Sequence, residues 1–101
     1  MAPSKLIHVD FEVFGRVQGV LFRKYTQEKA KSIGIHGWIR NTKQHTVQGV
    51  LEGETNAIEA MKTWLSNEGS PNSKIDQAVF ANEKHIQKYS ILGPFLIFYG
   101  E

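Results

Sequence analysis

The sequence predicts one α+β domain whose elements follow in the order strand, helix, two strands, helix and strand, with a further short strand near the C-terminus. Apolar and polar side chains alternate close to the N-terminus, which is typical of a strand with one buried face. Two later segments carry apolar residues at helical spacing, and a glycine follows each of them. With 101 residues, 41% of them hydrophobic, the chain can bury one core, so we expect a single domain over residues 1–101.

The first half of the chain is expected to form a strand, a helix and a second strand. The first strand is predicted over residues 5–14, the helix over residues 21–33 before Gly34, and the second strand over residues 35–41. The apolar face of the first strand carries Ile7, Val9, Phe11 and Val13. The buried positions of the helix are expected to be Phe22, Tyr25, Ala30 and Ile33.

A hairpin and a second helix are expected next. The polar run 42–45 separates the second strand from a third strand over residues 46–52, so these two strands pair through a short turn. Glu54 or Thr55 begins the second helix, which ends at residues 67–69. Its buried stripe is predicted to be Ala57, Ile58, Met61, Trp64 and Leu65.

The last part of the chain is predicted to add two strands. A loop over residues 70–73 precedes a fourth strand over residues 75–82, and residues 94–99 are expected to form the short extra strand. The βαββαβ order fits a ferredoxin-like sandwich, in which two helices cover one face of an antiparallel sheet. Because that fold hosts many functions, the function must be inferred from the site residues.

Charge and cysteine content exclude several classes of function. Twelve basic and ten acidic residues are interspersed, so the net charge of +2 forms no basic stripe and does not favour nucleic acid as a partner. The absence of cysteine excludes disulfides and thiolate ligands and is compatible with a cytoplasmic location. The four histidines lack the spacing of metal ligands. No leader is expected, and no apolar run reaches the roughly 20 residues of a membrane span. We therefore expect no cofactor, metal or membrane. Because the sequence shows no further apolar stripe, we also expect a monomer.

The segment between the first strand and the first helix is predicted to bind an anion. Its sequence is Gly15, Arg16, Val17, Gln18, Gly19 and Val20. The two glycines permit positive φ angles that turn several N–H groups toward one point, and the helix N-terminus adds free amides and a positive dipole end. Arg23 lies in the first helical turn, where its guanidinium can donate two parallel hydrogen bonds to a phosphate. Arg16, Gln18 and Lys24 could assist.

A second polar group stands at the end of the second strand. Alternation places Asn41 on the same face as Ile35 and Ile39. An amide cannot transfer protons at neutral pH, but its oxygen can accept a hydrogen bond from water and its NH₂ can donate to an anion. Asn41 could therefore position a nucleophilic water.

Together these motifs resemble the acylphosphatase family. The resemblance extends over residues 15–20, 22–23, 37–38, 41–42 and 46–49. It implies hydrolysis of the carboxyl-phosphate anhydride bond of a small-molecule acyl phosphate, with inorganic phosphate as a product and without a metal. It also implies that the amides of the 15–20 loop bind the phosphate.

The resemblance assigns roles to individual residues as well. It implies that Arg23 binds the phosphate and that Asn41 orients the attacking water. Thr42 would fix either the Asn41 side chain or the turn. Two residues depart from the usual pattern of the family, since His45 replaces a glycine and Phe98 replaces an arginine. We expect both departures to affect turn geometry or stability more than the reaction.

Other functions remain open at this point. An anion sensor on the same fold would have the same loop and would differ only in lacking turnover. An RNA-binding domain would need exposed aromatic residues on its central strands, and the aromatic residues of this chain do not form that pattern. A stand-alone relative of acylphosphatase-like domains found inside larger maturation proteins is a third alternative.

Overall fold

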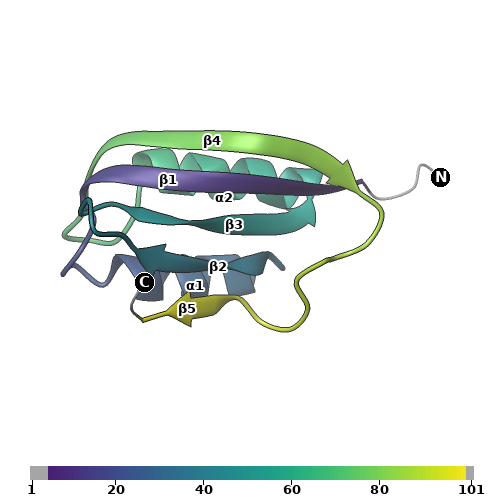
Figure 1. The fold of residues 1–101 in the computed structure, drawn as a ribbon, viewed down its shortest axis with the longest axis horizontal. Coiled ribbons are helices and arrows are strands. Elements are labelled where there is room, and N and C mark those ends of the chain that lie inside the picture. The colour runs from purple at the N-terminus through teal and green to yellow at the C-terminus, as the bar shows by residue number, and fades with distance from the viewer. Residues whose placement is uncertain (1–4, 100–101) are drawn as a thin grey trace.

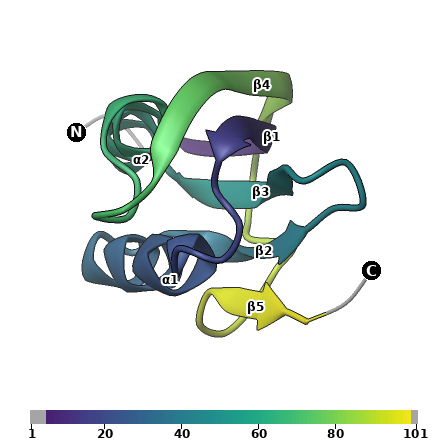
Figure 2. The same ribbon diagram turned by 90° about the vertical axis from the view of Figure 1, so that its left-hand side faces the viewer.

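The computed structural model describes residues 5–99, which form a five-stranded sheet with two helices on one of its faces (Figures 1 and 2). In chain order the elements are β1 (Leu6–Arg16), α1 (Phe22–Ser32), β2 (His36–Asn41), β3 (Val47–Glu54), α2 (Thr55–Asn67), β4 (Lys74–Ile86) and β5 (Leu96–Phe98). The ferredoxin-like α+β fold predicted from the sequence is confirmed. The N-terminal residues 1–4, on which the expectation of no leader partly rests, lie outside the described range.

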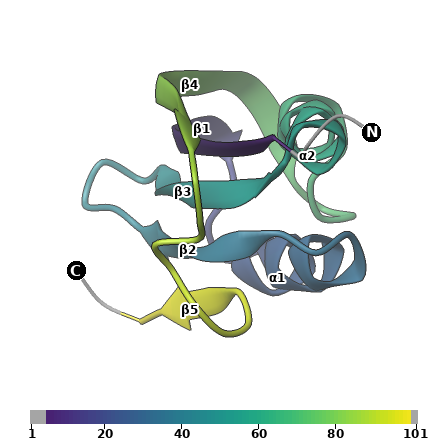
Figure 3. The same ribbon diagram turned by 90° about the vertical axis from the view of Figure 1, so that its right-hand side faces the viewer.

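The strand order in the sheet is β4-β1-β3-β2-β5, and the structure adds the direction of β5, which the sequence had left open. The first four strands pair antiparallel, as predicted, whereas β5 runs parallel to β2. The reason is topological. The chain leaves β4 at one edge of the sheet, crosses to the opposite edge and enters β5 from the same end at which β2 begins (Figure 3).

The core lies between the sheet and the two helices. The predicted apolar face of β1 is buried throughout, and β2, β3 and α2 bury residues at the expected period. In α1 one predicted position is wrong, because Tyr25 is 37% exposed and Thr26 is buried in its place. The Thr26 hydroxyl donates to the carbonyl of Phe22 at 2.8 Å, so the helix backbone satisfies this polar group inside the core.

The turn between β2 and β3 is held by two threonines. The Thr42 amide donates to the Thr46 carbonyl at 2.9 Å, and the Thr42 and Thr46 hydroxyl oxygens are 2.6 Å apart. Thr46 also donates to Glu12 on β1 at 2.6 Å. Thr42 was expected to fix either the Asn41 side chain or the turn. Its side chain bonds to Thr46, so it fixes the turn. His45 has a φ of 68°, which is the left-handed conformation that favours glycine.

We expect His45→Gly to raise the free energy of unfolding by about 1 kcal/mol, because a left-handed L-residue costs roughly 1–2 kcal/mol and the greater chain entropy of glycine offsets part of the gain. Urea denaturation measures this change. His45→Ala is the matched control, since it removes the same imidazole but keeps the Cβ atom. Equal effects of the two substitutions would show that backbone conformation is not the cause.

The segment between β4 and β5 is attached to the sheet by a buried carboxylate. Glu52 of β3 is 0% exposed and accepts hydrogen bonds from the backbone N–H groups of Ser90 and Ile91 at 2.9 and 3.1 Å. It also accepts a hydrogen bond from the Ser90 hydroxyl, and Nδ1 of His8 lies 2.6 Å from its second oxygen. Burial by itself raises the pKa of Glu52, but these four partners outweigh burial and lower that pKa below its ordinary value of 4.5.

This lowered pKa predicts that acid destabilises the protein through Glu52. The carboxylate contributes stability above its unfolded-state value of 4.5, and that contribution is lost as the pH falls through the lower folded-state pKa. Between pH 5 and pH 3, the free energy of unfolding should therefore fall more steeply for the wild type than for Glu52→Gln. Urea denaturation at several pH values measures both slopes. Parallel slopes would mean that the folded and unfolded states bind this proton equally.

Within residues 5–99, neither helix has the length and apolar character needed to cross a membrane. In the same part of the chain, no three or more His, Asp or Glu residues are grouped as metal ligands would be.

Candidate active site

The loop after β1 has the backbone conformation expected of an anion cradle. Gly15, Gly19 and Leu21 have φ angles of 128°, 73° and 60°. A Cβ atom on Gly15 would lie 2.1 Å from the carbonyl oxygen of Lys74, so no side chain fits there. Gly19 has open space around it, so its requirement for glycine comes from its φ angle alone. Within the described chain, the amides of residues 17–20 donate to no backbone carbonyl, so they are available to a ligand.

Leu21 begins α1 in a strained conformation. It occupies the N-cap position in the left-handed region, and no side chain caps the helix there. Strained, non-glycine residues of this kind often lie at functional sites. Because no side chain caps the first turn of α1, its free amides and positive dipole end favour an anion there. Residues of this turn and of the loop line one pocket, described below.

Gln18 joins the loop to the β2–β3 turn. Its Nε2 donates to the carbonyl oxygens of Thr42 and Thr46 at 3.0 and 2.8 Å. The Gln18 side chain is thus committed to protein partners, and only its backbone amide remains for an anion. These two hydrogen bonds fix the position of the loop relative to the end of β2 that carries Asn41.

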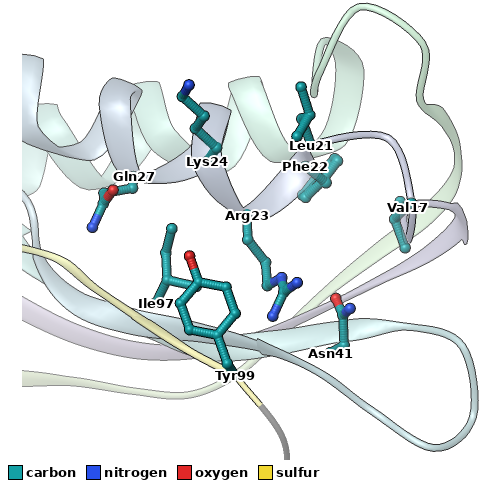
Figure 4. A pocket seen from close by; sticks show the side chains of 10 residues that line it. Val17, Leu21, Phe22, Arg23, Lys24, Gln27, Asn41, Ile97 and Tyr99 are labelled. Atoms are coloured by element: carbon teal, nitrogen blue, oxygen red, sulfur yellow. The ribbon is translucent and has the colours of Figure 1, made fainter.

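Arg23 extends from the first turn of α1 toward β5 and the end of β2 (Figure 4). Its Nη1 donates to the carbonyl of Phe98 at 3.1 Å, and its guanidinium carbon lies 4.8 Å from the centre of the Tyr99 ring. One donor is used by the protein, and the remaining N–H groups of the guanidinium are available to a ligand. The carbonyl and the ring orient the guanidinium without neutralising its charge.

Asn41 lies on the helix-facing side at the end of β2, where alternation predicts it. Its Oδ1 is buried and has no hydrogen-bond partner within the described chain. A buried acceptor without a partner is unfavourable in a folded protein and commonly marks a water or ligand position. In Figure 4 its side chain points toward that of Arg23.

One pocket of about 490 Å³ brings the two predicted residues together. Its described lining residues are Val17, Gly19, Leu21, Phe22, Arg23, Lys24, Gln27, Asn41, Ile97 and Tyr99. They include two cations and, within residues 5–99, neither a carboxylate nor an imidazole. The described part of the lining therefore contributes positive charge, which suits an anionic ligand.

Not every predicted residue lines this pocket. Gly15, Arg16, Gln18 and Val20 belong to the loop but are not among the described lining residues. Lys24, which the sequence indicated as a possible assistant, does line it, although Figure 4 shows its side chain directed away from Arg23.

Sequence reasoning did not assign five of the lining residues to the site: Leu21, Phe22, Gln27, Ile97 and Tyr99. Gln27 could have been found, because it lies four positions after Arg23 on the same helix face. Its Nε2 donates to the carbonyl of Phe95 at 2.8 Å. Ile97 and Tyr99 had no local signal, since the parallel pairing of β5 with β2 brings them to the site.

The structure accounts for the unusual residue Phe98. Its ring packs against Trp38 at a centroid distance of 5.6 Å and is 47% exposed, so the side chain lies away from the pocket. The contact with Arg23 is made by its backbone carbonyl, which any residue at this position supplies.

Comparison with known proteins gives a consistent result. The family model described as acylphosphatase matches residues 9–92. The chain is 52% identical over 92 residues to acylphosphatase-2 of Anas platyrhynchos, which covers 91% of this chain and 89% of the relative. It is 54% identical over 85 residues to acylphosphatase-2 of Homo sapiens, and this match covers 84% of this chain and 86% of that relative. The crystal structure of acylphosphatase from Bacillus subtilis matches with a TM-score of 0.82 and 31% identity, covering 92% of this chain and 99% of that chain.

Proposed function

Since the chain belongs to the acylphosphatase family and hydrolyses acyl phosphates, we propose that Arg23 and the 15–20 loop bind the phosphate and that Asn41 positions the attacking water. One observation carries this proposal. The guanidinium of Arg23 and the unpartnered Oδ1 of Asn41 share a single pocket whose described lining has cations and no carboxylate.

In the proposed reaction, water attacks phosphorus and the bond between phosphorus and the acyl oxygen breaks. The electron pair of that bond leaves on a carboxylate, whose conjugate acid has a pKa of about 4, so a general acid is not required. Arg23 and the loop amides stabilise the charge on the phosphoryl oxygens, and Asn41 Oδ1 accepts a hydrogen bond from the water. The proton lost by the water passes to an oxygen of the substrate phosphate.

This proton path predicts that none of the histidines supplies a catalytic base. The described lining of the pocket contains no imidazole, and His45, in the β2–β3 turn, is the histidine nearest Asn41 in the sequence. We expect His45→Ala and His85→Ala to retain the shape of the wild-type pH-rate profile. The rate constants for benzoyl phosphate between pH 4 and pH 8 measure it. Loss of the acid limb of the profile in either variant would identify that imidazole as the base.

The proposed function is tested by hydrolysis of benzoyl phosphate in the presence of EDTA. We expect turnover that inorganic phosphate inhibits competitively. Glycerol phosphate is the matched substrate control, because it presents the same phosphate but would have to expel an alkoxide, which requires a general acid. It should bind and not react. Binding of phosphate without hydrolysis of the acyl phosphate would indicate an anion sensor instead.

We also propose that the protein acts as a monomer in the cytoplasm and that its partners are the acyl phosphate and inorganic phosphate, without nucleic acid or a membrane surface. The lack of cysteine and the interspersed charges support this proposal. Sedimentation equilibrium at assay concentrations, with and without an oligonucleotide, tests the oligomeric state and the nucleic-acid expectation.

A further inference from the structure

Glu52 is buried although it lies on the face of the sheet opposite the helices. Leu51 and Gly53 flank Glu52 in β3 and lie on the core side of the sheet. In the sheet, Glu52 is paired with His8 of β1 on one side and with His36 of β2 on the other. A carboxylate in the middle of such a row would normally be solvent-exposed. It is 0% exposed here because the segment between β4 and β5 packs over it.

The row of His8, Glu52 and His36 holds three successive residues of that segment. Glu52 accepts from both backbone amides and from the hydroxyl at residues 90–91, as described above. His36 Nδ1 donates to the carbonyl of Ile91 at 2.9 Å, and its ring stacks on Tyr89 with centroids 3.9 Å apart. The carboxylate is the centre of this anchor, since its two oxygens accept three hydrogen bonds from the segment.

The anchored segment leads directly to the Arg23 contact. Ile91 is seven residues before Phe98, whose carbonyl accepts the hydrogen bond from Arg23. β5, which ends at Phe98, has only three residues and pairs parallel to β2 at the edge of the sheet. So short an edge strand is weakly held by its own hydrogen bonds, so its position depends on contacts before and after it. The contacts before it include the Glu52 anchor and buried Phe95, whose carbonyl accepts the hydrogen bond from Gln27.

We propose that Glu52 is a positioning residue for the hydrolysis of acyl phosphates. By fixing residues 90–91, it holds β5 in register against β2. β5 and the residue after it present the Phe98 carbonyl and the Tyr99 ring that orient the guanidinium of Arg23. Glu52 contacts no substrate, and its effect passes through Arg23. The inference therefore rests on the role proposed for Arg23 in binding phosphate.

The test is a double-mutant cycle between Glu52→Gln and Arg23→Lys, with the inhibition constant of inorganic phosphate as the readout. Glutamine keeps the size of the side chain, but its NH₂ group cannot accept the hydrogen bonds that one carboxylate oxygen accepts. In the wild-type background, Glu52→Gln should raise the inhibition constant about tenfold, because misplacing a binding group by a fraction of an ångström weakens its hydrogen bonds. In the Arg23→Lys background, the same substitution should raise it less than about twofold.

Trp38 supplies a spectroscopic readout of the same movement. Its ring contacts Phe98, so in a Trp64→Phe background, where Trp38 is the sole tryptophan, displacement of β5 should change the fluorescence of folded Glu52→Gln. Ile58→Val in α2 is the matched control, since it removes a buried methyl group far from the segment and lowers stability without touching the anchor. It should change neither the inhibition constant nor the Trp38 emission.

Ser90→Ala is a milder variant in case Glu52→Gln does not fold. It removes one hydrogen bond to Glu52 from an exposed residue, and it should raise the inhibition constant about threefold in the wild-type background and not in the Arg23→Lys background. An unchanged constant in a folded Glu52→Gln or Ser90→Ala protein overturns the inference. An equal increase in both backgrounds also overturns it, because the effect would then not pass through Arg23. If Arg23→Lys alone has no effect on phosphate inhibition, the role proposed for Arg23 fails instead.

Discussion

Asn41→Ala should lower kcat for benzoyl phosphate about 100- to 1000-fold, which is the loss expected when one preorganised polar group at the reacting centre is removed. The inhibition constant of inorganic phosphate should change by less than about threefold, because the product phosphate needs no attacking water. A large effect on kcat with little effect on phosphate binding is therefore the signature of water positioning. Steady-state rates and phosphate inhibition measured on the same preparations test it.

The same substitution should not destabilise the protein. Among residues 5–99, Asn41 Oδ1 is buried and has no hydrogen-bond partner, so the folded state bears an unfavourable desolvation that alanine removes. We expect the free energy of unfolding of Asn41→Ala to equal or exceed that of the wild type, as when a group is retained for activity at the expense of stability. Asn72→Ala, in an exposed loop after α2, is the matched control for loss of an asparagine. A rise in KM with kcat unchanged would instead make Asn41 a phosphate-binding residue.

The parts of the fold that depend on local pattern could be predicted from the sequence. Alternation along β1 gave its buried face, and the same rule placed Asn41 on the helix-facing side of β2. The approach of Arg23 to Asn41 was indicated by the combination of two motifs, each weak by itself. The pocket that both residues line supports that interpretation.

The parts that depend on distant partners could not be predicted. Gln18 was interpreted as a possible anion ligand, yet its side chain bonds to carbonyls 24 and 28 residues away. Tyr99 reaches the site only because β5 pairs parallel to β2. In each case the deciding partner lies outside the window that a periodic pattern samples.

Arg23→Lys should lower kcat/KM for benzoyl phosphate by a factor that corresponds to about 3 kcal/mol or more of transition-state stabilisation, and it should also raise the inhibition constant of phosphate. This second effect distinguishes Arg23 from Asn41. The guanidinium uses one donor on the Phe98 carbonyl and keeps a planar pair of donors for two phosphoryl oxygens. A lysine ammonium is a point charge that cannot present this planar fork to the phosphate while bonding to the carbonyl, so one of the two contacts is lost.

Two further measurements make this prediction specific to the guanidinium. Arg40→Lys is the matched control. Arg40 is the residue before Asn41, so its side chain lies on the opposite face of β2, where it bonds to Gln48. It should change kcat/KM by less than about twofold, because its guanidinium contacts Gln48 and Trp38 and is not among the described lining of the pocket. In Arg23→Ala, added guanidinium should restore part of the rate, since a pocket of about 490 Å³ has room for it beside the phosphate. Added ammonium at the same concentration should restore less, because it supplies the charge without the planar pair of donors. Equal rescue by the two cations would mean that the site requires positive charge alone and that the orientation imposed by Phe98 and Tyr99 is unnecessary for catalysis.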